Sequence, residues 1–132
     1  MKILFVCKAN TIRSQMAEAF YNRVHPGCAK SAGTVVDIPG EKLSSRHKGA
    51  NALVVMKEIG IDISDKTRRE VTRKMLDDFD KVIVMAEPYT LPHYLINNPK
   101  VDYWSIENPV YMDIEDTRKI RDQILKKIKT IV

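Results

Sequence analysis

The sequence predicts an α/β fold, a single three-layer domain over residues 1–132 in which helices flank a four-stranded parallel sheet. Segments 2–6 and 81–85 are short apolar runs without polar alternation, which is typical of strands buried on both faces. Helical patterns alternate with the strand candidates, and this alternation is typical of a parallel sheet covered on both sides. The length of 132 residues is about that of one domain.

The N-terminal half contains two strand candidates and two helix candidates. Strand 2–6 leads into a polar turn at 7–12 and then a helix, which ends at His25-Pro26-Gly27. Residues 28–34 are a plausible second strand, and 35–48 look like a long surface loop. The apolar face of the first helix is formed by Met16, Ala17, Phe20 and Val24. The second helix stops at Gly60, and its apolar face is formed by Ala52, Val55, Met56 and Ile59.

The C-terminal half supplies the remaining elements. Residues 61–72 are irregular and charged, and 73–79 are expected to form one or two helical turns. Strands are predicted at 81–85 and, more weakly, at 101–104. A long amphipathic helix closes the chain, and its apolar positions are Ile114, Thr117, Ile120, Ile124, Ile128 and Ile131.

Composition excludes several classes of protein. Hydrophobic residues make up 44% and charged residues 30% of the chain, as in ordinary globular proteins. No apolar stretch reaches about 18 residues, so we expect no transmembrane helix and no membrane partner. Two cysteines are too few for a disulfide framework and fit a reducing cytoplasm. The net charge of +5 is not gathered into one basic tract, so we expect no nucleic-acid partner.

The turn after the first strand carries the clearest chemical pattern. Ligands of parallel sheets bind beyond the carboxyl ends of the strands, where Cys7 and Arg13 bracket this turn. Successive backbone N–H groups and a helix N-terminus can bind a tetrahedral oxyanion there, and Arg13 can close the site with a two-pronged hydrogen bond. The same field favours the thiolate of Cys7, the nucleophilic form, and Ser14 can donate to its sulfur.

A simpler interpretation is that Cys7 ends a buried strand and Arg13 lies on the surface. An arginine in the first turn of a helix opposes the helix dipole, however, and therefore favours an anion nearby.

Five segments resemble one known family: 7–19, 31–34, 60–64, 78–85 and 104–109. The run Cys7-Lys8-Ala9-Asn10-Thr11-Ile12-Arg13-Ser14 is similar to the signature of the low-molecular-weight protein tyrosine phosphatase and thioredoxin-coupled arsenate reductase superfamily. The likeness spans nearly the whole chain. It implies a four-stranded parallel sheet, a phosphocysteine intermediate and no metal or organic cofactor.

The resemblance also implies roles for individual residues. Cys7 corresponds to the nucleophile and Arg13 to the residue that binds the oxyanion. Asn10 corresponds to the residue that holds the loop in shape, Ser14 to the thiolate's support, and Ser31 to a serine that contacts the asparagine. The remaining members of the oxyanion-binding loop are Lys8, Ala9, Thr11 and Ile12.

The sequence departs from this family at the general acid. Active members carry an Asp-Pro pair near the C-terminus, and this chain has Asn108-Pro109 there. An amide cannot donate a proton as a carboxylic acid does, and such help is typically worth about 10²–10⁴-fold in rate. The acidic residues just downstream either replace the missing acid or serve only as the acidic first turn of the last helix: Asp113, Glu115 and Asp116.

A second departure concerns redox chemistry. The region from Trp104 to Pro109 resembles the arsenate reductase branch, which uses two further cysteines downstream of the third strand. Residues 85–91 contain none, and Cys28 is expected at the end of the sheet opposite the turn. A reductase of this kind therefore needs an external thiol.

The leading hypothesis is a cytoplasmic phosphatase acting on phosphotyrosine or aryl phosphates, slowed by Asn108. The alternatives are an arsenate reductase-like oxidoreductase that uses an external thiol, and a non-catalytic module that binds phosphate or phosphoproteins. The expected ligand is phosphate, phosphotyrosine or arsenate. Five aromatic residues are candidates either for a pocket wall or for ordinary packing: Tyr89, Tyr94, Tyr103, Trp104 and Tyr111.

Overall fold

Four parallel strands form one sheet in the order β2-β1-β3-β4 in the computed structural model, which describes residues 1–132. The strands are β1 (Ile3–Cys7), β2 (Ala29–Gly33), β3 (Lys81–Val84) and β4 (Val101–Tyr103). In the register of the sheet, Ile3 lies opposite Ala29 and Lys81, and Cys7 lies opposite Gly33. The predicted parallel sheet is confirmed.

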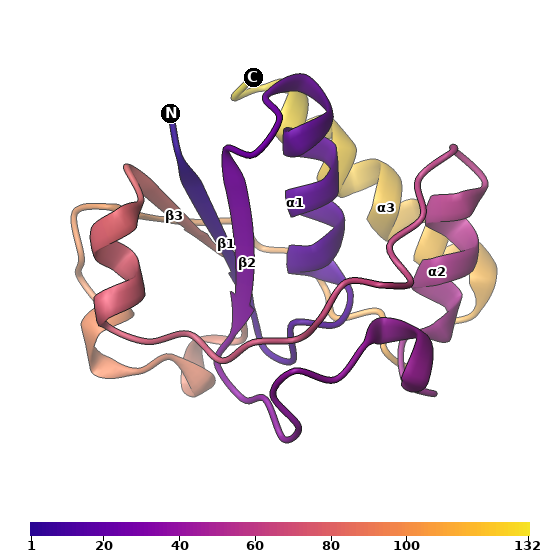
Figure 1. Cartoon of the computed structure of the whole chain (residues 1–132), viewed down its shortest axis with the longest axis horizontal. Coiled ribbons are helices and arrows are strands. Elements are labelled where there is room, and N and C mark those ends of the chain that lie inside the picture. Colours follow the sequence, from indigo (N-terminus) through magenta and orange to yellow (C-terminus); the bar gives the residue numbers. More distant parts are fainter.

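Helices cover both faces of this sheet and complete the predicted three layers. The helices α1 (Arg13–Val24), α2 (Ala50–Lys57) and α3 (Ile114–Lys129) lie on one side of the sheet (Figure 1). Short 3-10 helices and their connections lie on the other side. They are η2 (Lys74–Asp78), η3 (Pro88–Thr90) and η4 (His93–Leu95), while η1 (Leu43–Ser45) belongs to the long loop before α2.

The alternation of side chains along β1 divides the core into two clusters. Ile3, Phe5 and Cys7 pack with α1, α2 and α3, whereas Leu4 and Val6 pack with residues of η2 and η4. All five residues of β1 are buried, as expected for a central strand. Cys7 is therefore fixed by the core as the last residue of the most buried strand.

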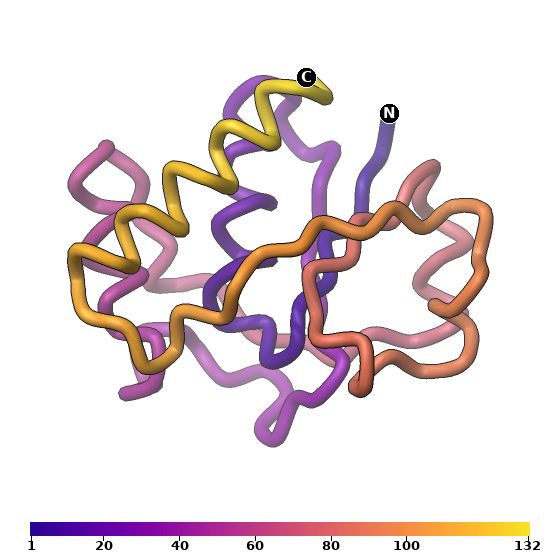
Figure 2. Tube along the Cα trace, turned by 180° about the vertical axis from the view of Figure 1, so that it is seen from behind, coloured from indigo at the N-terminus to yellow at the C-terminus, as the bar shows by residue number.

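The carboxyl ends of the strands define one functional edge of the molecule. The chain termini lie together at the opposite end (Figure 1). The tube view shows the connection from β4 to α3, in orange, running back past the indigo turn that follows β1 (Figure 2). Three segments distant in sequence, 7–13, 34–49 and 104–113, contribute residues to one cavity at this edge.

Details at the helix ends differ from the sequence prediction. Val24, expected on the apolar face of α1, is 55% exposed because the helix projects beyond the sheet there. Ile59 and Ile131 pack against the core from turns that follow α2 and α3 rather than from the helices. No helix has both the length and the apolar character that a membrane crossing requires.

Candidate active site

The turn between β1 and α1 leaves its backbone donors free. No hydrogen bond within the chain is made by the backbone N–H of any residue from Lys8 to Gln15. The carbonyls of Cys7 and Lys8 are occupied instead, because they accept from the N–H groups of Thr34 and Val35 at 2.9 and 2.8 Å. Such a row of unpaired donors at a helix N-terminus is suited to an anion.

Asn10 fixes the shape of this turn. Its backbone has a φ of 53°, a left-handed conformation, and its side chain is fully buried. The side-chain Nδ2 donates to Ser14 Oγ at 2.8 Å and to Ser31 Oγ at 3.0 Å, while Oδ1 accepts from Gln15 Nε2 at 3.2 Å and the N–H of Arg69 at 2.9 Å. Asn10 thus contacts both Ser14 and Ser31.

Gly33 allows the turn to lie against the end of β2. A Cβ added at this position would lie 2.7 Å from the carbonyl oxygen of Lys8 and 2.8 Å from the backbone nitrogen of Asn10. Both are backbone atoms, so the turn itself would have to move. The absence of a side chain at Gly33 is thus a condition for the observed geometry.

The sulfur of Cys7 lies at a small, largely enclosed cavity. Cys7 is 2% exposed, and its Sγ is 3.0 Å from Ser14 Oγ. Because Ser14 Oγ already accepts from Asn10, its own hydroxyl hydrogen is available to donate to the sulfur. The cavity has a volume of about 30 Å³ and is lined by Cys7, Ala9, Thr11, Ile12, Arg13, Arg46, Asn108 and Val110.

Arg13 is held on one side only. Its side chain is 2% exposed, and its Nη1 faces three acceptors: the carbonyl oxygens of Met85 and Ile106 at 2.6 and 3.0 Å, and Glu87 Oε1 at 2.7 Å. The other two guanidinium nitrogens, Nε and Nη2, have no partner in the chain, and both retain contact with solvent. The core thus orients Arg13 so that its two-pronged edge is free to bind an oxyanion.

Asn108 contributes another donor to the same cavity. Its Oδ1 accepts from the N–H of Val110 at 3.2 Å, and its Nδ2 has no partner. The acidic candidates downstream serve the helix instead, since Asp113 is the N-cap of α3 and accepts from the N–H of Asp116 at 2.8 Å. Asp113, Glu115 and Asp116 are all exposed, and none of them lines the cavity. The cavity therefore contains hydrogen-bond donors but no carboxylic acid.

A larger groove of about 700 Å³ adjoins the Cys7 cavity and shares Asn108 and Val110 with it. Its lining includes Tyr89, Tyr103 and Tyr111, and the Lys8 ammonium lies 5.8 Å from the centre of the Tyr89 ring. The other two aromatic candidates lie elsewhere. Trp104 is buried against Phe5, with 6.1 Å between ring centres, and Tyr94 lines a separate pocket.

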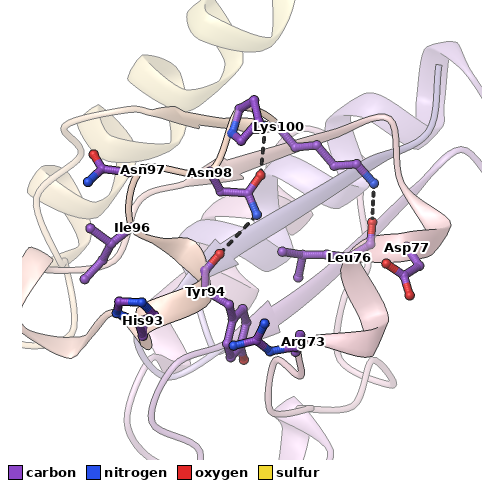
Figure 3. Close-up of a pocket in the computed structure, with 10 residues that line it drawn as sticks. Arg73, Leu76, Asp77, His93, Tyr94, Ile96, Asn97, Asn98 and Lys100 are labelled. Carbon is purple, nitrogen blue, oxygen red and sulfur yellow. Dashed lines mark hydrogen bonds between the residues drawn. The ribbon is translucent and has the colours of Figure 1, made fainter.

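That separate pocket, of about 450 Å³, lies between η2 and residues 93–100 (Figure 3). It shares no residue with the Cys7 cavity and contains no cysteine. Two of its donors are occupied, since Asn98 Nδ2 donates to the carbonyl of Tyr94 and Lys100 Nζ to that of Leu76. The Arg73 guanidinium stacks on the Tyr94 ring at 5.5 Å. The cavity at Cys7 is therefore the better candidate for the active site.

Three charged residues at the site escaped the sequence analysis: Arg46, Arg68 and Glu87. The side chain of Arg68 is fully buried, with Nε donating to the carbonyl of Ala9 at 3.0 Å and Nη1 donating to Asp37 and Glu41 at 2.8 Å each. The hydrogen bond from Arg68 lowers the pKa of Asp37 below its usual value. Of the three, only Glu87 could have been identified from the sequence, because it follows β3 at the carboxyl edge of the sheet, where ligands are expected.

Cys28 lies far from this chemistry, as expected. It immediately precedes β2, and its carbonyl accepts from the N–H of Ile3 at the start of β1, whereas Cys7 ends the same strand. No three His, Cys, Asp or Glu residues are grouped so that they could hold a metal ion.

Comparison with known proteins agrees with this architecture. Residues 2–132 match the family model described as low molecular weight phosphotyrosine protein phosphatase. The chain is 32% identical to the glutaredoxin arsenate reductase of Synechocystis sp. over 99% of its own length and 95% of that protein's. It is 31% identical to an arsenate reductase of Halalkalibacterium halodurans, over 97% and 92% of the two chains.

Solved structures give the same result. A low molecular weight protein tyrosine phosphatase from T. tengcongensis superposes with a TM-score of 0.81 at 28% identity, covering 99% of this chain and 97% of that one. An arsenate reductase in a phosphate-binding state superposes with a TM-score of 0.80 at 30% identity, covering 99% and 96%. This chain belongs to the low molecular weight phosphotyrosine protein phosphatase family.

Proposed function

We propose that the protein hydrolyses aryl phosphate monoesters, phosphotyrosine among them, with Cys7 as the nucleophile. The observation that carries this proposal is the buried Cys7 sulfur beside Ser14, in a cavity lined by Arg13 and Asn108. The Nε and Nη2 of Arg13 and the Nδ2 of Asn108 have no partner in the chain. The adjoining groove supports an aryl substrate, because three tyrosines line it.

Two displacements at phosphorus complete the reaction. The Cys7 thiolate attacks in line, the S–P bond forms, and the bond to the leaving oxygen breaks. Backbone N–H groups and Arg13 hold the oxygens of the transferred group. Water then attacks the phosphocysteine, which releases phosphate and restores the thiolate. Asn108 supplies no proton, so the leaving group departs as an anion or takes its proton from water, and we expect esters with poor leaving groups to react slowly.

Arsenate reduction with an external thiol is the second candidate, favoured by the 32% identity to a glutaredoxin arsenate reductase. In this reaction Cys7 displaces hydroxide from arsenate. An external thiol then attacks the Cys7 sulfur, two electrons pass to arsenic, and arsenite leaves. A second external thiol reduces the resulting mixed disulfide. Both electrons come from outside the chain because Cys28 lies at the opposite end of the sheet.

One set of assays separates these reactions. The wild type and the Cys7→Ser variant are assayed with an aryl phosphate, and separately with arsenate plus glutathione or a dithiol protein. Cys28→Ser is the matched control, since it removes the chain's other thiol away from the site. We expect phosphate release that is lost in Cys7→Ser and kept in Cys28→Ser. Arsenite without phosphate release would support the second candidate, and phosphate binding without either product would contradict both.

A further inference from the structure

Arg46 comes from a different part of the chain and also lines the Cys7 cavity. It directly follows η1 in the loop between β2 and α2, and it lines the same cavity as Cys7, Arg13 and Asn108. Its side chain is 14% exposed. A largely buried guanidinium is a costly arrangement unless its charge and all of its donors have partners.

The hydrogen bonds of Arg46 parallel those of Arg13. Both arginines are held by carboxylates through Nη1, Arg13 by Glu87 and Arg46 by Glu41 and Asp37. In each of them Nε and Nη2 have no partner in the chain, and the Nε of Arg46 is fully buried. The edge formed by Nε and Nη2 is one that can grip two oxygens of a tetrahedral anion.

The carboxylates that hold Arg46 are engaged more closely elsewhere. Arg46 Nη1 lies 3.3 Å from Glu41 and 3.5 Å from Asp37, whereas Arg68 Nη1 lies 2.8 Å from each of them. Arg68 therefore takes the shorter, stronger bonds, and the charge of Arg46 is the less compensated of the two. That charge is available to a ligand in the cavity.

We propose that Arg46 is a second oxyanion-binding residue, which makes the cavity selective for doubly charged tetrahedral anions such as phosphate, arsenate and phosphate monoesters. Two guanidinium edges, the Asn108 amide and the backbone N–H groups then surround the anion with donors. A monoanionic phosphate diester gains less from the second cation, and its additional substituent would occupy space that the donors enclose. The choice of substrates among these anions rests on the proposed function, whereas binding of the anion does not.

Binding can be measured without turnover in a Cys7→Ser background. Titration calorimetry with inorganic phosphate and with dimethyl phosphate, a monoanion, compares Arg46→Met, Arg46→Lys and the unmodified background. Arg73→Met is the matched control, because it removes an arginine from the separate pocket. We expect Arg46→Met to weaken phosphate binding by about 10–100-fold, the range for a hydrogen bond to a charged group. The preference for phosphate over dimethyl phosphate should fall with it, and Arg73→Met should change neither.

The Arg46→Lys variant guards against a purely structural effect. Lysine keeps the positive charge and the aliphatic part of the side chain but lacks the planar guanidinium that can bond two oxygens at once. We therefore expect this variant to bind phosphate at least about fivefold more weakly than the Cys7→Ser background, with an unchanged thermal midpoint. A folded Arg46→Met or Arg46→Lys protein with full phosphate affinity and selectivity would overturn the proposal and assign Arg46 to loop support alone. Absence of phosphatase and reductase turnover in the wild type, with phosphate binding still dependent on Arg46, would reject only the proposed function.

Discussion

Replacing Asn108 by aspartate should place a general acid in a cavity that contains hydrogen-bond donors but no carboxylic acid. The side chain keeps nearly the same volume, and one carboxylate oxygen can still accept the N–H of Val110, as Oδ1 does now at 3.2 Å. The other oxygen then takes the place of Nδ2, which has no partner and belongs to a residue lining the Cys7 cavity. The exchange therefore adds a group that can donate a proton to the leaving group, with little change in the geometry of the site.

The expected gain follows from what the acid does. General acid–base help is worth about 10²–10⁴-fold, and water partly replaces it in the parent protein, so we expect Asn108→Asp to speed aryl phosphate hydrolysis by about 10–10³-fold. This gain corresponds to about 1.4–4 kcal/mol of barrier. It should be largest for substrates whose leaving groups are poor, since these most need a proton as the bond breaks.

A series of aryl phosphates with graded leaving groups provides the assay. The rate of the variant should depend less steeply on leaving-group acidity than that of the parent. Equal slopes and equal rates in the two proteins would refute the reasoning. Asp113→Asn in the parent chain then shows whether a downstream acid already acts, although Asp113 caps α3 and lies outside the cavity.

Three further predictions follow from other parts of the structure. Cys28→Ser should leave turnover within a few-fold in steady-state assays, because Cys28 lies at the end of the sheet opposite Cys7 and does not line the cavity. Gly33→Ala should weaken phosphate binding by more than about tenfold and destabilise the fold by about 1–3 kcal/mol in denaturant melts, because its Cβ would overlap backbone atoms of the turn. Hydrogen bonding from Arg118 lowers the pKa of Glu58. The stability that this pair contributes is therefore present above the unfolded pKa of about 4.3 and lost as pH falls through the lower folded value, so Glu58→Gln should flatten the acid limb of a melting-temperature profile.

The sequence predicted the elements that local patterns specify. Continuous apolar runs located β1 and β3, and the position of Cys7 at the end of β1 located the anion-binding turn. The anchoring of Arg13 by Met85 and Ile106 was not predictable, because these contacts join residues 72 and 93 positions apart. The same holds for Arg68, whose contact with Ala9 spans 59 positions and leaves no periodic signal in the chain. Local pattern thus locates the cysteine and the turn that follows it, and tertiary packing selects the charges around them.

The unpaired N–H groups from Lys8 to Gln15 have a consequence for the protein as a thermodynamic system. A bound anion supplies the acceptors that these groups lack, whereas the unfolded chain offers it no such site. Ligation therefore adds stability as RT ln(1 + [L]/Kd), or about 2.7 kcal/mol when the anion is present at a hundred times its dissociation constant. Resistance of the turn to amide hydrogen exchange and to proteolysis should accordingly rise with the anion concentration of the surrounding medium. On this reasoning, inorganic anions that bind at the turn add to the stability of the fold.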